Sequence, residues 1–141
     1  MENAQNQNID QQMYQFQYLR EQRDVLAQNL SIFNASLQDH TNTKVTLENL
    51  KNTKEEDEIL VPIGSIAVIK SKIRDSNKVL INISQDIVIE KDLDSAIEFI
   101  DKIVNQHTEQ IKLMNDRLYQ LDMTLQGMSQ MIAQQRGYPQ Q

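Results

Sequence analysis

Ile-Leu-Val-Pro-Ile-Gly-Ser-Ile-Ala-Val-Ile-Lys-Ser-Lys-Ile-Arg-Asp-Ser-Asn-Lys-Val-Leu-Ile-Asn-Ile-Ser-Gln-Asp-Ile-Val-Ile-Glu-Lys, the segment Ile59–Lys91, decides the fold of this chain. β-Branched residues crowd it, and turn-forming groups interrupt it at Pro62–Gly64, Asp75–Asn77 and Ser84–Asp86. This pattern is typical of short strands joined by tight turns. It predicts two β-hairpins, with strands at about 59–61, 65–73, 78–84 and 87–91.

The two predicted hairpins are too small to be stable on their own. Isolated hairpins are marginal in water, and they leave strand edges without hydrogen-bond partners. We therefore expect these strands to pair with other subunits. Residues two apart in a strand share a face, which groups Val79, Ile81 and Ile83. The side chains expected at the subunit contacts are Ile66, Val68, Val79, Ile81, Ile83, Ile87 and Ile89.

Long stretches of helical periodicity flank the hairpins. We predict one helix over 8–52, with Asn8 or Asp10 as N-cap, and another over 92–136, with Asp92 as N-cap. Along both, apolar residues recur at alternating spacings of three and four, the seam of a coiled coil. Eight of thirteen seam positions are apolar in the first helix and eleven of thirteen in the second. The predicted fold class is α+β, a single unit over 1–141: a long antiparallel coiled coil with two β-hairpins at its base.

Matching the two seams predicts their register. Facing residues should have numbers that total 144, so that Phe33 faces Ile111 and Leu26 faces Leu118. This register makes the two chain ends neighbours, far from the hairpins along helices that rise about 1.5 Å per residue.

Gln and Met concentrate toward the two chain ends. Met is unbranched and polarizable, and such side chains suit a surface that accepts many partners. We therefore predict a binding surface at the far end of the coiled coil. In the simpler alternative, Phe16, Leu125, Met128 and Ile132 only fill the seam. The predicted binding residues are Met13, Tyr14, Phe16, Leu125, Met128, Met131 and Ile132.

Composition argues against several other functions. The net charge is −6 without a basic patch, which argues against nucleic-acid binding, and no apolar run approaches the roughly 20 residues of a membrane span. The chain has no cysteine, no phosphate loop and no catalytic triad pattern, so we predict no enzyme activity and no cofactor. His40 and His107 lack a carboxylate at suitable seam spacing, and we predict no metal site. The seam cations Arg23, Lys44 and Lys51 are expected to extend their charges to solvent.

The order helix, two hairpins, helix, with Leu60-Val61-Pro62-Ile63-Gly64 opening the strands, resembles the alpha-class subunit of archaeal-type prefoldin. The string Glu90–Phe99 resembles the family's entry into its second helix. The likeness covers nearly the whole chain. It departs from the family at Ser65–Ala67 and Ser84–Asp86, where alpha subunits often carry glycine-rich turns.

The resemblance implies a cytoplasmic, ATP-independent chaperone subunit. Two alpha and four beta subunits would form a hexamer, whose hairpins build a β-barrel platform and whose coiled coils hold unfolded proteins at their tips. The tips would pass these clients to a group II chaperonin. A structural coiled-coil scaffold that docks one defined partner is the alternative function, and it should not suppress the aggregation of unrelated denatured proteins.

Overall fold

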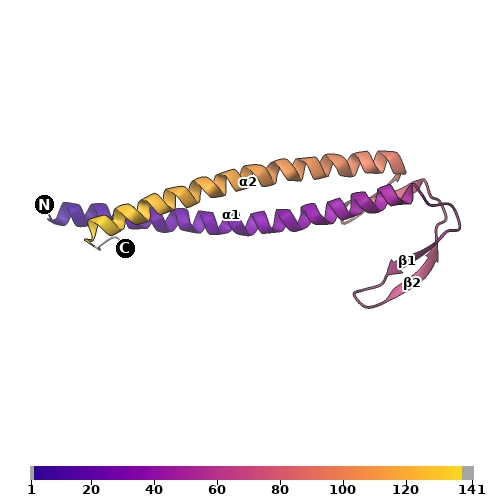
Figure 1. The fold of residues 1–141 in the computed structure, drawn as a ribbon, viewed down its shortest axis with the longest axis horizontal. Helices are drawn as coiled ribbons and strands as arrows, with labels where there is room; N and C mark the ends of the chain where they lie inside the picture. The colour runs from indigo at the N-terminus through magenta and orange to yellow at the C-terminus, as the bar shows by residue number, and fades with distance from the viewer. Residues whose placement is uncertain (1, 138–141) are drawn as a thin grey trace. The chain divides into compact units, whose positions relative to one another are not determined.

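The computed structural model describes residues 2–137, with side chains from residue 6. Two long helices pack together, and two β-hairpins lie between them in the sequence, which confirms the predicted α+β fold (Figure 1). The chain divides into two compact units. We call residues 2–36 and 107–137 the terminal unit and residues 37–106 the hairpin unit. The elements are α1 (Glu2–Leu50), β1 (Glu58–Pro62), β2 (Val68–Lys72), β3 (Lys78–Ser84), β4 (Ile87–Asp92) and α2 (Leu93–Gln135).

The first helix begins earlier than predicted. α1 starts at Glu2, so Asn8 and Asp10 lie inside the helix and neither is its N-cap. The Asn8 side chain instead accepts a weak hydrogen bond from Gln12 Nε2 at 3.4 Å. The preceding residues include Glu, Ala and Gln, which favour helix, and neither Gly nor Pro interrupts them. The prediction placed too much weight on capping side chains that a helix surface also tolerates.

The predicted seam is confirmed along both helices. Every predicted seam position is buried or half-buried except Lys51, just beyond the end of α1, and Gln135, the last residue of α2. The predicted Asp92 cap is confirmed as well. Its carboxylate accepts hydrogen bonds from the Ser95 backbone N–H at 2.8 Å and the Ser95 hydroxyl at 2.9 Å.

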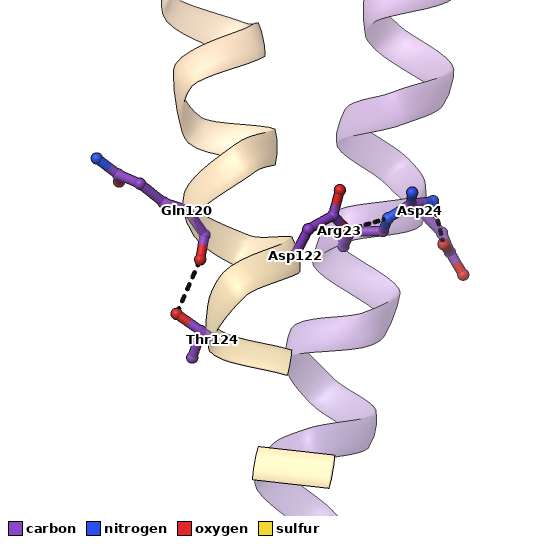
Figure 2. A network of polar contacts seen from close by, with 5 residues as sticks. All are labelled: Arg23, Asp24, Gln120, Asp122 and Thr124. Carbon is purple, nitrogen blue, oxygen red and sulfur yellow. Dashed lines mark hydrogen bonds and ion pairs between the residues drawn. The ribbon is translucent and has the colours of Figure 1, made fainter. Parts of the chain in front are cut away.

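Three ion pairs between the helices agree with the predicted register. Arg23 Nε lies 2.8 Å from Asp122 Oδ1 in the terminal unit, where Figure 2 shows the two side chains pointing toward each other from α1 and α2. In each pair, the aspartate directly follows the α2 seam residue that the cation was predicted to face; Arg23, for example, was predicted to face Leu121 and contacts Asp122. In the hairpin unit the corresponding distances are 2.5 Å for Lys44–Asp101 and 3.0 Å for Lys51–Asp94. These cations therefore bind carboxylates of the other helix, and the prediction that they extend only to solvent was wrong.

The four strands form two separate antiparallel sheets. β1 pairs with β2 from Glu58↔Lys72 to Pro62↔Val68, and β3 pairs with β4 from Lys78↔Asp92 to Ser84↔Ile87, with a bulge near Ile83. The Asp75 carboxylate accepts the Asn77 backbone N–H at 2.9 Å, the turn that the sequence predicted.

The second strand is shorter than predicted, because residues 65–67 belong to a turn. Gly64 has φ of 91°, a conformation that glycine adopts at no steric cost. The Ile63 N–H then donates to the Ala67 carbonyl oxygen at 2.9 Å and closes the turn. β2 can start only after it, at Val68.

A small apolar core holds the hairpin unit together. Residues of β3, α1 and α2 form it, and Val79 and Ile89 pack against it from the second hairpin. One face of this hairpin is thus occupied by helix side chains. The buried residues of this core are Leu47, Ile81, Leu93, Ala96 and Ile100.

Candidate binding surfaces

The last turns of α2 form a shallow groove with the beginning of α1 in the terminal unit. Met128 and Ile132 are seam residues four apart and Met131 lies beside them, so all three approach α1 on one side of the helix. Gln12 and Gln15 complete a groove of about 260 Å³, and no charged residue lines it. Gln12 Oε1 is shielded there without a hydrogen-bond partner among the described residues. The groove therefore combines apolar, flexible walls with the uncharged amide side chains of Gln12 and Gln15.

The other predicted tip residues have different surroundings. Tyr14 is 78% exposed, whereas Phe16 and Leu125 are half-buried in the seam. Met13 is also half-buried, and its sulfur accepts a hydrogen bond from Arg136 Nη2 at 2.7 Å. Phe16 and Leu125 thus match the seam-filling alternative, while Met128 and Ile132 both fill the seam and line the groove.

Two further grooves, which the sequence prediction missed, lie on the flank of the terminal unit. One, of about 460 Å³, runs beside Tyr18, Val25 and Leu121, and the other, of about 520 Å³, beside Leu19, Tyr119 and Met123. Arg117 lines both. A signal was present in α1, because the exposed apolar residues Tyr18, Val25 and Ile32 recur every seven positions outside the seam.

The hairpin unit presents an apolar surface on its strands and turns. Ile66, at the turn of the first hairpin, is 98% exposed, and Val68, Ile83 and Ile87 are exposed too. Val79, Ile81 and Ile89 pack toward the helices and are used within the chain. The predicted contact set therefore divides into an inner group and an outer group. The sequence prediction left out further exposed apolar side chains of this unit: Leu60, Ile63, Ile69, Leu80 and Val88.

The strand edges are the second feature of the hairpin unit. Each sheet has only two strands, so β1, β2, β3 and β4 all keep one edge that no described strand covers. Backbone N–H and C=O groups along such edges are ready to pair with another chain. These open edges, together with the exposed apolar side chains beside them, would allow further strands to add to each sheet.

Charged side chains form ion pairs in the helix contacts, but none lines the groove of Gln12, Gln15, Met128, Met131 and Ile132, which we call the tip groove. The hydrogen bond to Asp122 raises the pKa of Arg23, and the hydrogen bond to Asp101 raises the pKa of Lys44. Hydrogen bonds from the Ser95 backbone and hydroxyl lower the pKa of Asp92 below its ordinary 3.8.

The described residues offer no alternative chemistry. Residues 2–137 contain no cluster of three His, Cys, Asp or Glu side chains that could hold a metal ion. His107 instead lies against the Phe33 ring, with 5.4 Å between ring centroids, and its Nε2 is 3.4 Å from Ser36 Oγ. Within the same range, neither helix has a stretch apolar enough to cross a membrane.

Comparisons with known proteins give one consistent result. The family model described as prefoldin subunit matches residues 8–137. The prefoldin subunit alpha of Pyrococcus horikoshii is 35% identical over 118 residues, 83% of this chain and 80% of that protein. Prefoldin subunit alpha 1 of Thermococcus kodakarensis is 35% identical over 99 residues, 70% and 68% of the two chains. A chain of filamentous PFD from Methanocaldococcus jannaschii, solved by cryo-EM, has the same fold, with a TM-score of 0.67, 21% identity and coverage of 79% and 93%.

Proposed function

We propose that this chain, which belongs to the prefoldin family of non-enzymatic chaperones and is similar to its alpha subunits, holds unfolded proteins at the end of its coiled coil. The observation that carries the proposal is the uncharged groove of Gln12, Gln15, Met128, Met131 and Ile132. Non-native chains expose apolar side chains of every shape, and flexible methionine walls adapt to them.

The polar side chains of the groove fit the same role. An unfolded segment carries backbone N–H groups that need acceptors once they leave water. Gln12 and Gln15 line the groove beside the apolar wall, and side-chain amides can accept such hydrogen bonds. Because no charge lines the groove, clients of either net charge could bind without desolvating an ion. These properties favour broad selectivity over recognition of one partner.

We also propose that the hairpin unit completes its sheets with beta-type prefoldin subunits, in a hexamer of two alpha and four beta subunits with a β-barrel platform. The four open strand edges support this assembly. The outer group would supply apolar contacts, because its side chains are exposed on the chain alone: Ile66, Val68, Ile83 and Ile87. Family membership further suggests a cytosolic location and delivery of held clients to a group II chaperonin.

Client holding can be tested with a pair of exposed residues, one from each helix. Tyr14 and Met131 are 78% and 51% exposed, so Tyr14→Ser with Met131→Ser leaves the seam intact. Burial against a client is worth about 25 cal/mol per Å² of apolar surface, and both side chains would lose that gain. We expect the double variant to assemble normally but to suppress the aggregation of denatured proteins much less than the wild type.

The matched control removes equally exposed apolar side chains elsewhere in the terminal unit. Ile32→Ser with Leu113→Ser changes residues that are 64% and 60% exposed, again one from each helix, and neither lines the tip groove. This control should hold clients normally. Equal holding by the two variants would place client binding elsewhere, and no holding by the wild-type complex would favour the scaffold alternative.

A further inference from the structure

We infer that the ion pairs Arg23–Asp122, Lys44–Asp101 and Lys51–Asp94 select one register of the antiparallel coiled coil, and that their six residues are positioning residues. The inference goes beyond the proposed function and does not require it. It begins from a geometric regularity: the same relation between a seam cation and an aspartate occurs in the terminal unit and twice in the hairpin unit.

The regularity is stated most simply in residue numbers. In each pair the two numbers total 145, one more than the total for facing seam residues. The cation therefore occupies a seam position, and its side chain extends past the facing seam residue to the next residue of α2, which we call the flank position. Arg23 and Lys44 donate hydrogen bonds to their aspartates, and Lys51 Nζ lies within ion-pair distance of Asp94, at 3.0 Å. The aliphatic stems of the cations cover the seam while their charged ends meet the aspartates.

The sequence keeps cations and aspartates matched along the whole coil. The seam positions of α1 that lie a multiple of seven residues from Arg23 form one series. Four of them carry apolar residues, and none of these has a carboxylate at the corresponding flank position of α2. The four combinations are Ile9 with Arg136, Phe16 with Ser129, Leu30 with Asn115 and Leu37 with Thr108. Aspartate occupies the flank position only where the seam residue is a cation.

A shift of the helices by seven residues breaks most of this matching. Shifted one way, Lys51 meets Asp101, but Lys44 meets Thr108 and Arg23 meets Ser129. Shifted the other way, only Lys44 keeps an aspartate, Asp94, while Arg23 meets Asn115. Each shift thus leaves two of the three seam cations without a facing aspartate. Polar residues at seam positions are a known means of specifying register at some cost in stability.

Apolar packing can also select the register in the hairpin unit, but it does so poorly in the terminal unit. In the hairpin unit the core of Leu47, Ile81, Leu93, Ala96 and Ile100 also fixes how the helices meet. That core is absent from the terminal unit, where the seam near Arg23 is mostly leucine. Leucines seven residues apart are interchangeable, so packing discriminates poorly there. The leucines concerned are Leu19, Leu26, Leu30, Leu118, Leu121 and Leu125.

The register decides what faces the tip groove. In the observed register Phe16 is the predicted partner of Met128, and glutamines complete the groove. A shift by seven residues in one direction would place Arg23 opposite Met128 and bring a charge into an uncharged surface. This consequence, unlike the register itself, rests on the proposed function.

Disulfide cross-linking can measure the register, because the chain contains no cysteine of its own. The full-length chain carries either Leu26→Cys with Leu118→Cys, which reports the observed register, or Leu26→Cys with Leu125→Cys, which reports the shifted one. Each pair is combined with Arg23→Leu and with the triple change Arg23→Leu, Lys44→Leu, Lys51→Leu. Arg23→Lys, which keeps the cation, is the control.

In the wild-type and Arg23→Lys backgrounds we expect the observed-register pair to dominate. One exposed ion pair changes an equilibrium by a factor of about two to five. The shifted register keeps one of the three pairs, Lys51 with Asp101, so the triple change should raise the shifted cross-link about 4- to 25-fold relative to the observed one. The melting temperature of the triple variant should not fall, because leucine suits the seam. A merely stabilising role predicts the opposite: a lower melting temperature and an unchanged ratio of cross-links. An unchanged ratio in both leucine backgrounds would overturn the inference.

Discussion

Two adjacent residues of β3 give the sharpest test of how the hairpin unit divides between folding and assembly. Ile81 is 9% exposed and belongs to the core with Leu47 and Leu93, whereas Leu80 is 71% exposed on the opposite face. The sequence analysis placed Ile81 among the side chains expected at the subunit contacts. The structure changes that expectation, because Ile81 packs against both helices.

The expected magnitudes differ strongly between the two positions. Ile81→Ala removes buried methyl groups and leaves a cavity, so the free energy of unfolding should fall by about 2–5 kcal/mol. For a chain of this size that corresponds to a melting temperature lower by roughly 6–20 °C. Leu80→Ala truncates a mostly exposed side chain, and its effect on the free energy of unfolding should stay below about 0.5 kcal/mol.

Assembly should show the reverse order. Leu80→Asp places a charge on the exposed face of the second hairpin, and a subunit interface there would have to bury that ion at high cost. We expect the variant chain to melt like the wild type but to fail to form a complex when co-expressed with a beta-type subunit, as measured by the mass of the purified complex. A full-size complex with Leu80→Asp, or an unaffected melting temperature with Ile81→Ala, would refute this division of the two faces.

Two further changes test local features of the hairpin unit. Glu56 adopts a φ of 72°, which Asn tolerates better, but its Oε2 also accepts a hydrogen bond from Lys72 Nζ at 3.0 Å. In a Lys72→Ala background, where that ion pair is already lost, Glu56→Asn should raise the free energy of unfolding by about 0.5–1 kcal/mol in urea titrations, while Glu55→Asn should change it little. The folded pKa of Asp92 lies below its ordinary 3.8, so its contribution to stability is present above about pH 4 and is lost as the pH falls through the folded pKa. Asp92→Asn keeps an N-cap acceptor without this titration, and it should lose less stability than the wild type between about pH 5 and pH 2; equal acid sensitivity would contradict the assignment.

The helices were predictable because their periodicity is repeated many times. A seam of thirteen positions tolerates several polar exceptions, and the matching of two seams restricts the register to steps of seven residues. Single local signals proved weaker. Asn8 and Asp10 looked like helix caps, yet the glutamines and alanine before them extended α1 to Glu2.

The hairpin faces were harder to assign from sequence for a different reason. β3 carries apolar residues on both faces, Val79 and Ile81 on one and Leu80 on the other, so alternation cannot say which face the helices cover. Only the packing against Leu47 and Leu93 settles it. The flank groove beside Tyr18 and Val25 was not predictable from the seam pattern, because these two exposed residues lie outside the seam.

Charged residues are unevenly distributed along the coiled coil: they form the ion pairs along much of its length and are absent from stretches near its ends. The three ion pairs between the helices involve α1 from Arg23 onward and α2 up to Asp122. Beyond them, residues 123–135 of α2 carry no charge at all, and residues 11–19 of α1 carry none either. These stretches therefore carry none of the ion pairs that fix register, and their seam consists mainly of Met, Leu and aromatic side chains that can repack. The proposed client-binding surface would need this freedom, while the inferred register pairs act on the rest of the same two helices.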